Sequence, residues 1–135
     1  MKNWEKVSHK KFNIGVAVLV VCLASVVVGL LMVRYETERI YESIEPIGDS
    51  SKANLGYSKG WTRYTTGFSA TLTSPIGDMN VIIIVDNTTV YQRYHIYDVN
   101  FKYELNPAHH TIFIAISNPS TSTILVTGKI TFQNW

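Results

Sequence analysis

The chain has 135 residues, of which 46% are hydrophobic and 16% are charged, with a formal net charge of +2 and one cysteine. This length allows one domain, or one domain with a membrane segment. One cysteine excludes a disulfide scaffold, and the hydrophobic and aromatic content excludes intrinsic disorder. Beyond the N-terminus the sequence has no basic stripe, which excludes a nucleic-acid partner.

A hydrophobic segment predicts a transmembrane helix over 12–33. Its 22 residues carry no charge. A helix of this length spans ~33 Å, which is enough to cross the hydrocarbon core of a bilayer. Four lysines lie in 1–11, whereas glutamates outnumber arginines in 34–45. Segments rich in lysine and arginine stay on the cytoplasmic side of a membrane. We therefore expect a single-pass protein of the cell membrane, with 1–11 as a cytoplasmic basic N-terminus and an extracytoplasmic C-terminal domain.

Three kinds of N-terminal segment fit this pattern: an uncleaved signal anchor, the leader and helix of a pilin-like subunit, and a cleaved secretory signal. The apolar run is longer than the ~7–15 residues of a cleavable signal and ends without a small-residue cleavage site. Gly15 offers a position for leader processing, but without the charge usual beside it. The pattern favours the signal anchor and leaves the other two open.

Small residues on one face of this helix predict a contact with another transmembrane helix. The residues of this face recur at spacings of three and four: Gly15, Val18, Cys22, Ser25 and Gly29. Helices in lipid approach closely where side chains are small, and Ser25 and Gly29 form a small-xxx-small pair. We expect this face to bind other transmembrane subunits or copies of the chain. The alternative is that small residues are common in any membrane helix.

The segment 34–55 is expected to form a juxtamembrane helix and a linker. Ile40, Tyr41 and Ile44 recur at helical spacing among charged residues, and no helix breaker occurs before Pro46. The residues after Pro46 are typical of a linker.

The segment 56–135 predicts an all-β antiparallel sandwich of six to eight strands. Hydrophobic and polar residues alternate over 57–73 and 124–133, 79–85 is apolar on both faces, and turn residues separate the runs. The alternation changes phase at Ile96 and Tyr97, which predicts a bulge or corner where the chain crosses between sheets. Asn106 and Pro107 are expected to end that strand.

Two surface features of this domain are candidate sites. Asn87 begins an Asn-Thr-Thr sequon at an expected turn, which predicts N-glycosylation, although Asp-Asn is also an ordinary turn pair. Tyr91, Arg93 and His95 share one parity and are expected to face outward, away from Val90, Tyr94 and Ile96, as a contact strip. The favoured alternative for the strip is cross-strand aromatic pairing.

We expect no enzyme activity, no cofactor, no metal site and no small-molecule substrate. The domain has no cysteine, and His109 and His110 are adjacent on a strand, so their side chains should point to opposite faces. No nucleophile elbow, phosphate loop or paired-carboxylate spacing occurs.

The segment 110–132 resembles the last hairpin of emp24/GOLD-type sandwich domains, since an apolar strand meets an Asn-Pro turn at Asn118. That family places its membrane helix after the sandwich, so its cargo-receptor function is not carried over. The N-terminal helix and threonine-rich domain are also similar to small archaeal envelope proteins.

Together these features predict a non-catalytic membrane protein that serves as an accessory or structural subunit of a larger membrane complex, binding through its helix and its β-sandwich. The alternatives are a pilin-like filament subunit, with helices over Gly15 to Ile44 bundled into a core, and a cell-surface binding module.

Overall fold

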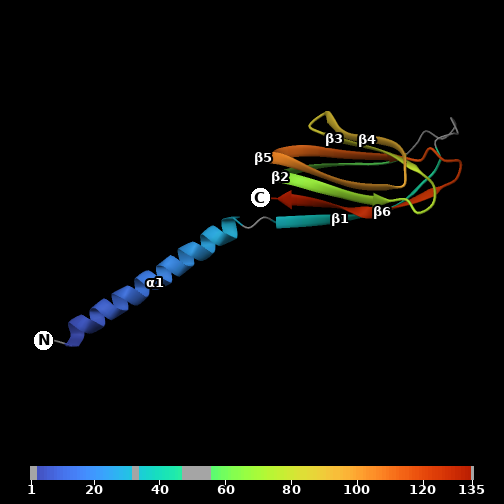
Figure 1. Cartoon of the computed structure of the whole chain (residues 1–135). Coiled ribbons are helices and arrows are strands. Elements are labelled where there is room, and N and C mark those ends of the chain that lie inside the picture. Colours follow the sequence, from blue (N-terminus) through green and yellow to red (C-terminus); the bar gives the residue numbers. More distant parts are fainter. Residues whose placement is uncertain (1–2, 32–33, 47–55, 135) are drawn as a thin grey trace. The chain divides into compact units, whose positions relative to one another are not determined.

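The computed structural model describes residues 3–31, 34–46 and 56–134, which divide into two compact units with a boundary between residues 33 and 34 (Figure 1). The first unit is the helix α1, Asn3–Leu31. Its span Lys11–Gly29 has a mean hydropathy of 2.5 and is 0% buried. The predicted apolar helix is confirmed, and it has the length and composition of a membrane anchor or a signal sequence. Residues 32–33 of the predicted span lie outside the described residues.

The second unit is an antiparallel six-stranded sheet with the order β1-β6-β2-β5-β3-β4. Its strands are β1 Arg34–Ile44, β2 Tyr57–Thr73, β3 Met79–Val85, β4 Thr88–Ile96, β5 Asp98–Ser117 and β6 Ile124–Asn134. The predicted fold class, an N-terminal helix followed by an all-β antiparallel domain, is confirmed.

The prediction of a helix after residue 33 is wrong, because Arg34–Ile44 is the edge strand β1 and pairs with β6 along its whole length. Ile40 and Ile44, which suggested helical spacing, are both buried. A spacing of four residues places two side chains on the same face of a strand as well as of a helix, so the two patterns coincide here. The β domain therefore begins at Arg34, and the predicted linker at 47–55 lies outside the described residues.

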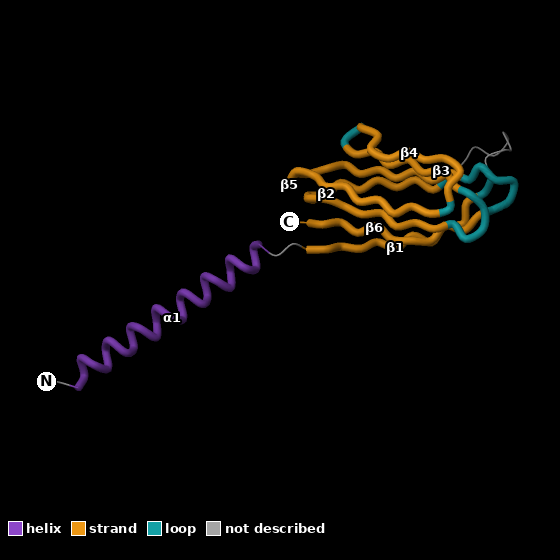
Figure 2. The backbone as a smooth tube through the Cα atoms, viewed as in Figure 1, coloured by secondary structure: helices purple, strands orange, loops and turns teal. Residues whose placement is uncertain are grey.

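The sheet forms two layers because β2 and β5 fold back on themselves as a paired ribbon (Figure 2). The ladder between them shifts register between Thr65 and Gly67. Before the shift, 57–65 pairs with 108–116. After it, 67–73 pairs with 98–104 and, on its other side, with β6. Since β3 pairs only with the second half of β5, β3 and β4 belong to one layer, and β1 and β6 belong to the other.

Two further expectations concern β4 and β5. The corner at Ile96 and Tyr97 is confirmed, because β4 ends at Ile96, β5 begins at Asp98, and the first half of β5 belongs to the other layer. The expected strand end at Asn106 and Pro107 is wrong. Here β5 continues to Ser117, and these residues only interrupt its pairing with β2.

The hydrophobic core lies between the two layers and draws side chains from both. Alternate residues of β3 and of the second half of β5 are buried, because successive side chains of a strand point to opposite faces. An aromatic contact joins the layers, because Trp61 in the first half of β2 lies 5.5 Å from Phe132 of β6, measured between ring centroids. Within its own layer, the Phe132 ring lies 6.5 Å from that of its register partner Phe68. The largest fully buried side chains include Phe132, Leu72, Met79, Ile83, Ile112, Ile114, Ile116, Ile124 and Ile130.

A close approach of β6 to β2 requires glycine at position 128. A Cβ atom there would lie 2.1 Å from the carbonyl oxygen of Thr71, so the two strands would have to move apart. We expect Gly128→Ala to lower the free energy of unfolding by ~1–3 kcal/mol, as overpacking does in a tight interior. Gly60→Ala is the matched control, because its Cβ would meet no atom closer than 3.6 Å. Urea denaturation followed by tryptophan fluorescence measures both, and equal stabilities would contradict the close-approach account.

Candidate functional site

The predicted helix-contact residues all lie on α1, where their side chains are exposed in the described unit. No atom lies within 4 Å of a Cβ built on Gly15 or Gly29. The Ser25 hydroxyl donates a hydrogen bond to the carbonyl oxygen of Val21 at 2.8 Å, which satisfies its polar atom within the helix. Val18 and Cys22 complete this face, which is open for contact with lipid or another helix. The contact itself stays a prediction.

Asn87 lies in the turn between β3 and β4, where the sequence predicted it. Asp86 and Asn87 have φ angles of 47° and 65°, the left-handed pair that a tight hairpin turn requires. Asn87, Thr88 and Thr89 are all exposed, so the sequon is presented on the surface. Glycosylation of Asn87 stays a prediction.

The expected outward row is wrong for Tyr91, whereas Arg93 and His95 are exposed as expected. The Tyr91 ring is partly buried and lies 4.9 Å from the Phe101 ring, while the Arg93 guanidinium lies over Tyr91 at 5.6 Å from its centroid. Tyr94, expected to face inward, is 54% exposed. The cause is two register shifts between β3 and β4, which break the simple alternation of faces.

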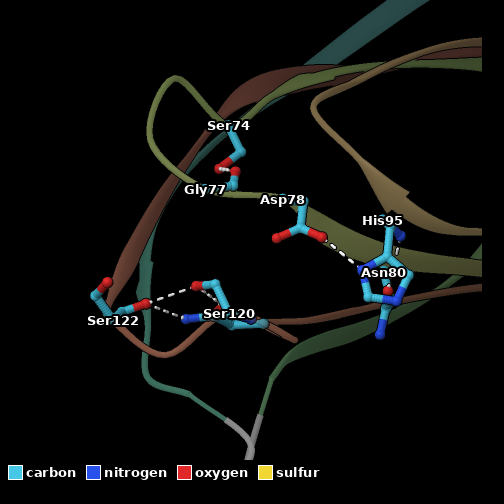
Figure 3. A network of polar contacts seen from close by, with 8 residues as sticks. Ser74, Gly77, Asp78, Asn80, His95, Ser120 and Ser122 are labelled. Carbon is cyan, nitrogen blue, oxygen red and sulfur yellow. Dashed lines mark hydrogen bonds and ion pairs between the residues drawn. The ribbon is translucent and has the colours of Figure 1, made fainter.

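His95 lies near the end of β4 with a φ angle of 54°, an uncommon value for a residue other than glycine. Figure 3 shows its ring beside Asp78, with Nδ1 2.6 Å from Asp78 Oδ2, and its backbone N–H donates to Asn80 Oδ1 at 3.0 Å. These two contacts explain why the strained conformation is retained.

The serines in this region serve the loops rather than His95. The Ser74 hydroxyl donates to the carbonyl oxygen of Gly77 at 2.8 Å, and the Ser120 hydroxyl donates to that of Ser122 at 2.9 Å (Figure 3). The buried Asn118 amide donates to the carbonyl oxygens of Ile44 and Ser122. In the part of the chain that the structure describes, no group of three or more His, Cys, Asp or Glu residues is placed to hold a metal ion. This end of the domain is therefore a set of polar contacts that fix three loops.

A polar seam that was not predicted from the sequence lies between the edge strand β1 and the first half of β2. Glu38 pairs with Lys59 and accepts a hydrogen bond from the indole Nε1–H of Trp61 at 2.5 Å. Glu36 pairs with Arg63, whose guanidinium lies 4.4 Å from the centroid of Phe132. The sequence did carry a signal for this seam. Glutamates occupy the alternate positions 36 and 38 of β1, and Lys59, Trp61 and Arg63 occupy alternate positions of β2.

This polar seam protects an exposed sheet edge. Glu36 and Glu38 are opposite Phe132 and Ile130 of β6, so they share the face of these core residues. Charged side chains that point inward from an edge strand disfavour pairing with another chain.

The contacts of the seam also lower the pKa of Glu38. The hydrogen bond from Lys59 is the largest influence, and the hydrogen bond from Trp61 acts in the same direction, against the effect of burial.

The comparisons with known proteins identify no family for this chain. No protein-family model matches it, and no curated protein matches it in sequence. A solved structure similar to it is that of a family two carbohydrate esterase from Cellvibrio japonicus, with 16% sequence identity and a TM-score of 0.46. The match covers 76% of this chain and 35% of the esterase chain. A likeness of this extent carries no argument about activity.

The polar seam generates a stability prediction. Glu38→Ala leaves the indole N–H of the nearly buried Trp61 without its acceptor. We expect the free energy of unfolding to fall by ~1–3 kcal/mol, the cost of an unsatisfied buried donor. Glu104→Ala is the control, because its pair with Lys102 spans 3.6 Å between highly exposed side chains and should change stability by less than ~0.5 kcal/mol. Urea denaturation measures both, and equal losses would contradict the role of the seam.

The same contact predicts a pH dependence. Because the pKa of Glu38 is lowered in the folded chain, its contribution is present above the ordinary glutamate pKa and is lost as the pH falls through the lowered value. The stability difference between the wild type and Glu38→Ala should therefore shrink in acid. A difference that stays constant down to about pH 3 would contradict this assignment.

Proposed function

We propose that the protein is a non-catalytic, single-pass subunit of a larger membrane complex. In this proposal α1 is an uncleaved anchor with its N-terminus in the cytoplasm, and the β domain is extracytoplasmic. The observation that supports it most is the state of α1, whose apolar span is 0% buried within its own unit. A helix that is hydrophobic all round requires an apolar environment, which lipid and partner helices provide.

The face of α1 with small side chains is the proposed site of partner contact. Gly15, Ser25 and Gly29 would let another backbone approach closely, and dispersion forces would then hold the helices together. The opposite face carries Val20 and Val27, branched side chains suited to lipid contact. The proposal therefore assigns one face to protein and the other to lipid.

The β domain would act by contact rather than by chemistry. It has its own core between two layers, its polar loop contacts are directed mainly at backbone atoms, and its edge strand β4 carries the exposed side chains of Gln92, Arg93 and Tyr94. Surfaces of this kind suit docking on the outer part of a partner protein.

A substitution on the small-residue face tests the proposal. We expect Gly29→Leu to reduce the amount of partner that co-purifies in mild detergent by about tenfold, which corresponds to ~1.4 kcal/mol, because the added side chain separates the helices. Val27→Leu, a change on the opposite face at a similar depth, is the matched control and should retain the partner. Quantitative mass spectrometry of the purified material measures both.

Unchanged co-purification with Gly29→Leu would contradict binding through this face. A homopolymer whose chains lack the residues before Gly15 would instead favour the filament subunit. The structure already limits that alternative, because α1 ends at Leu31 and the segment up to Ile44 is a strand.

A further inference from the structure

His110 links two distant parts of the β domain. Its Nδ1 lies 2.6 Å from Oδ2 of Asp86, in the turn between β3 and β4, and its Nε2 lies 2.7 Å from the carbonyl oxygen of Asn106, at the interruption of the β5 ladder. The turn is also bound to β5 directly. Asp86 Oδ1 accepts from the N–H of Thr111 at 2.8 Å, and the N–H of Asp86 donates to the carbonyl oxygen of Thr111 at 2.9 Å.

Asp86 is the charged group that contacts the ring of His110 directly. The His110 side chain is 12% exposed. Arg63 is opposite His110 in the β2–β5 register, but its guanidinium pairs with Glu36 of β1. The ring of the neighbouring His109 packs edge-on against Tyr64, at 5.3 Å between centroids.

Both ring nitrogens of His110 thus face oxygen atoms that can only accept hydrogen bonds. The imidazolium form donates to both, whereas either neutral tautomer places a nitrogen lone pair against an oxygen. The carbonyl of Asn106, the larger influence, and the carboxylate of Asp86 both raise the pKa of His110. The hydrogen bond from His110, followed by that from Thr111, lowers the pKa of Asp86.

We propose that Asp86, His110 and Asn106 form a proton-dependent latch that fastens the β3–β4 turn, with its exposed Asn87 sequon, to the fold-back of β5. The latch is closed while His110 carries two ring protons. Loss of one proton removes a donor from a nearly buried site, and the turn then separates from β5 more readily. The device thus couples the rigidity of the sequon-bearing turn to the external pH.

The pH range in which the latch is closed follows from the directions of the pKa shifts of His110 and Asp86. His110, with a raised pKa, contributes stability fully below its ordinary pKa and loses it as the pH rises through the raised value. Asp86, with a lowered pKa, contributes above its ordinary pKa and loses it as the pH falls through the lowered value. The latch is therefore strongest in mildly acidic solution.

His95 offers a matched control within the same domain. It makes the same contact with an aspartate, Nδ1 to Asp78 Oδ2 at 2.6 Å, but its side chain is 70% exposed. Its other ring nitrogen has no hydrogen bond within the described residues, so a neutral tautomer with the proton on Nδ1 can keep the contact. The two histidines therefore differ in that His110 has both ring nitrogens engaged and His95 has one.

The test compares the full chain in detergent micelles at about pH 5.5 and about pH 8.5, on either side of the ordinary histidine pKa. We expect the wild type to have a higher melting temperature than His110→Gln at the lower pH, and this advantage to shrink by about 4 °C at the higher pH. His95→Gln should follow the pH dependence of the wild type. Amide exchange at Thr111, corrected for the intrinsic effect of pH, should accelerate in the wild type as the pH rises.

Two results would overturn the latch. One is a wild-type advantage over His110→Gln that is the same at both pH values. The other is an NMR titration of wild-type His110 at or below the ordinary histidine value of ~6.5, which decides the matter without any variant. If His110→Gln does not fold, Asp86→Asn replaces it, because the asparagine oxygen can still accept from Thr111 while the charge opposite His110 is removed.

Discussion

The fold-back of the β2–β5 ribbon is the constraint on which the rest of the β domain depends. Because both strands reverse between Thr65 and Gly67 and between Glu104 and Ala108, one long pair supplies the centre of both layers. The core then forms between two halves of the same ribbon, and the remaining strands extend it on either side. The latch at His110 and the polar seam at Arg63 both lie beside this reversal, where the pairing is interrupted and side chains must supply contacts that the ladder does not.

The two open sides of the layered sheet are closed by different kinds of contact. The edge strand β1 turns Glu36 and Glu38 inward against Arg63, Lys59 and Trp61, so ionic contacts close that side. On the other side, Tyr91 of β4 packs on Phe101 of β5, so aromatic contact closes the gap between the layers. The inward glutamates give little stability through charge alone, since exposed pairs are worth ~0–1 kcal/mol. Their value lies in excluding a wrong strand from the edge.

The sequence predicted the structure correctly where a residue pattern fitted only one kind of secondary structure. The apolar run of β3, the alternation in β6, the turn at Asp86 and Asn87, and the corner near Tyr97 were all predictable from the hydrophobic pattern and turn chemistry. The strand β1 was not, because Ile40 and Ile44 satisfy both helical and strand spacing and only the pairing with β6 decides between them. The placements of Tyr91 and Tyr94 on β4 were predicted wrongly, because they depend on register shifts, which are a tertiary effect. The His110 latch joins residues 24 apart in the chain, a proximity that follows from the fold-back alone.

The β domain and α1 differ in whether they bury their own apolar surface. The domain has its own buried hydrophobic core, whereas α1 exposes an apolar surface that its own unit does not cover. A membrane complex would cover it, with partner contact on the face of Gly15 and Gly29. The most direct measurement is native mass spectrometry of the tagged chain, extracted from its own membrane in mild detergent. The account predicts an assembly that contains another membrane protein in fixed stoichiometry with this chain, and a chain recovered only as a monomer or a homopolymer would contradict it.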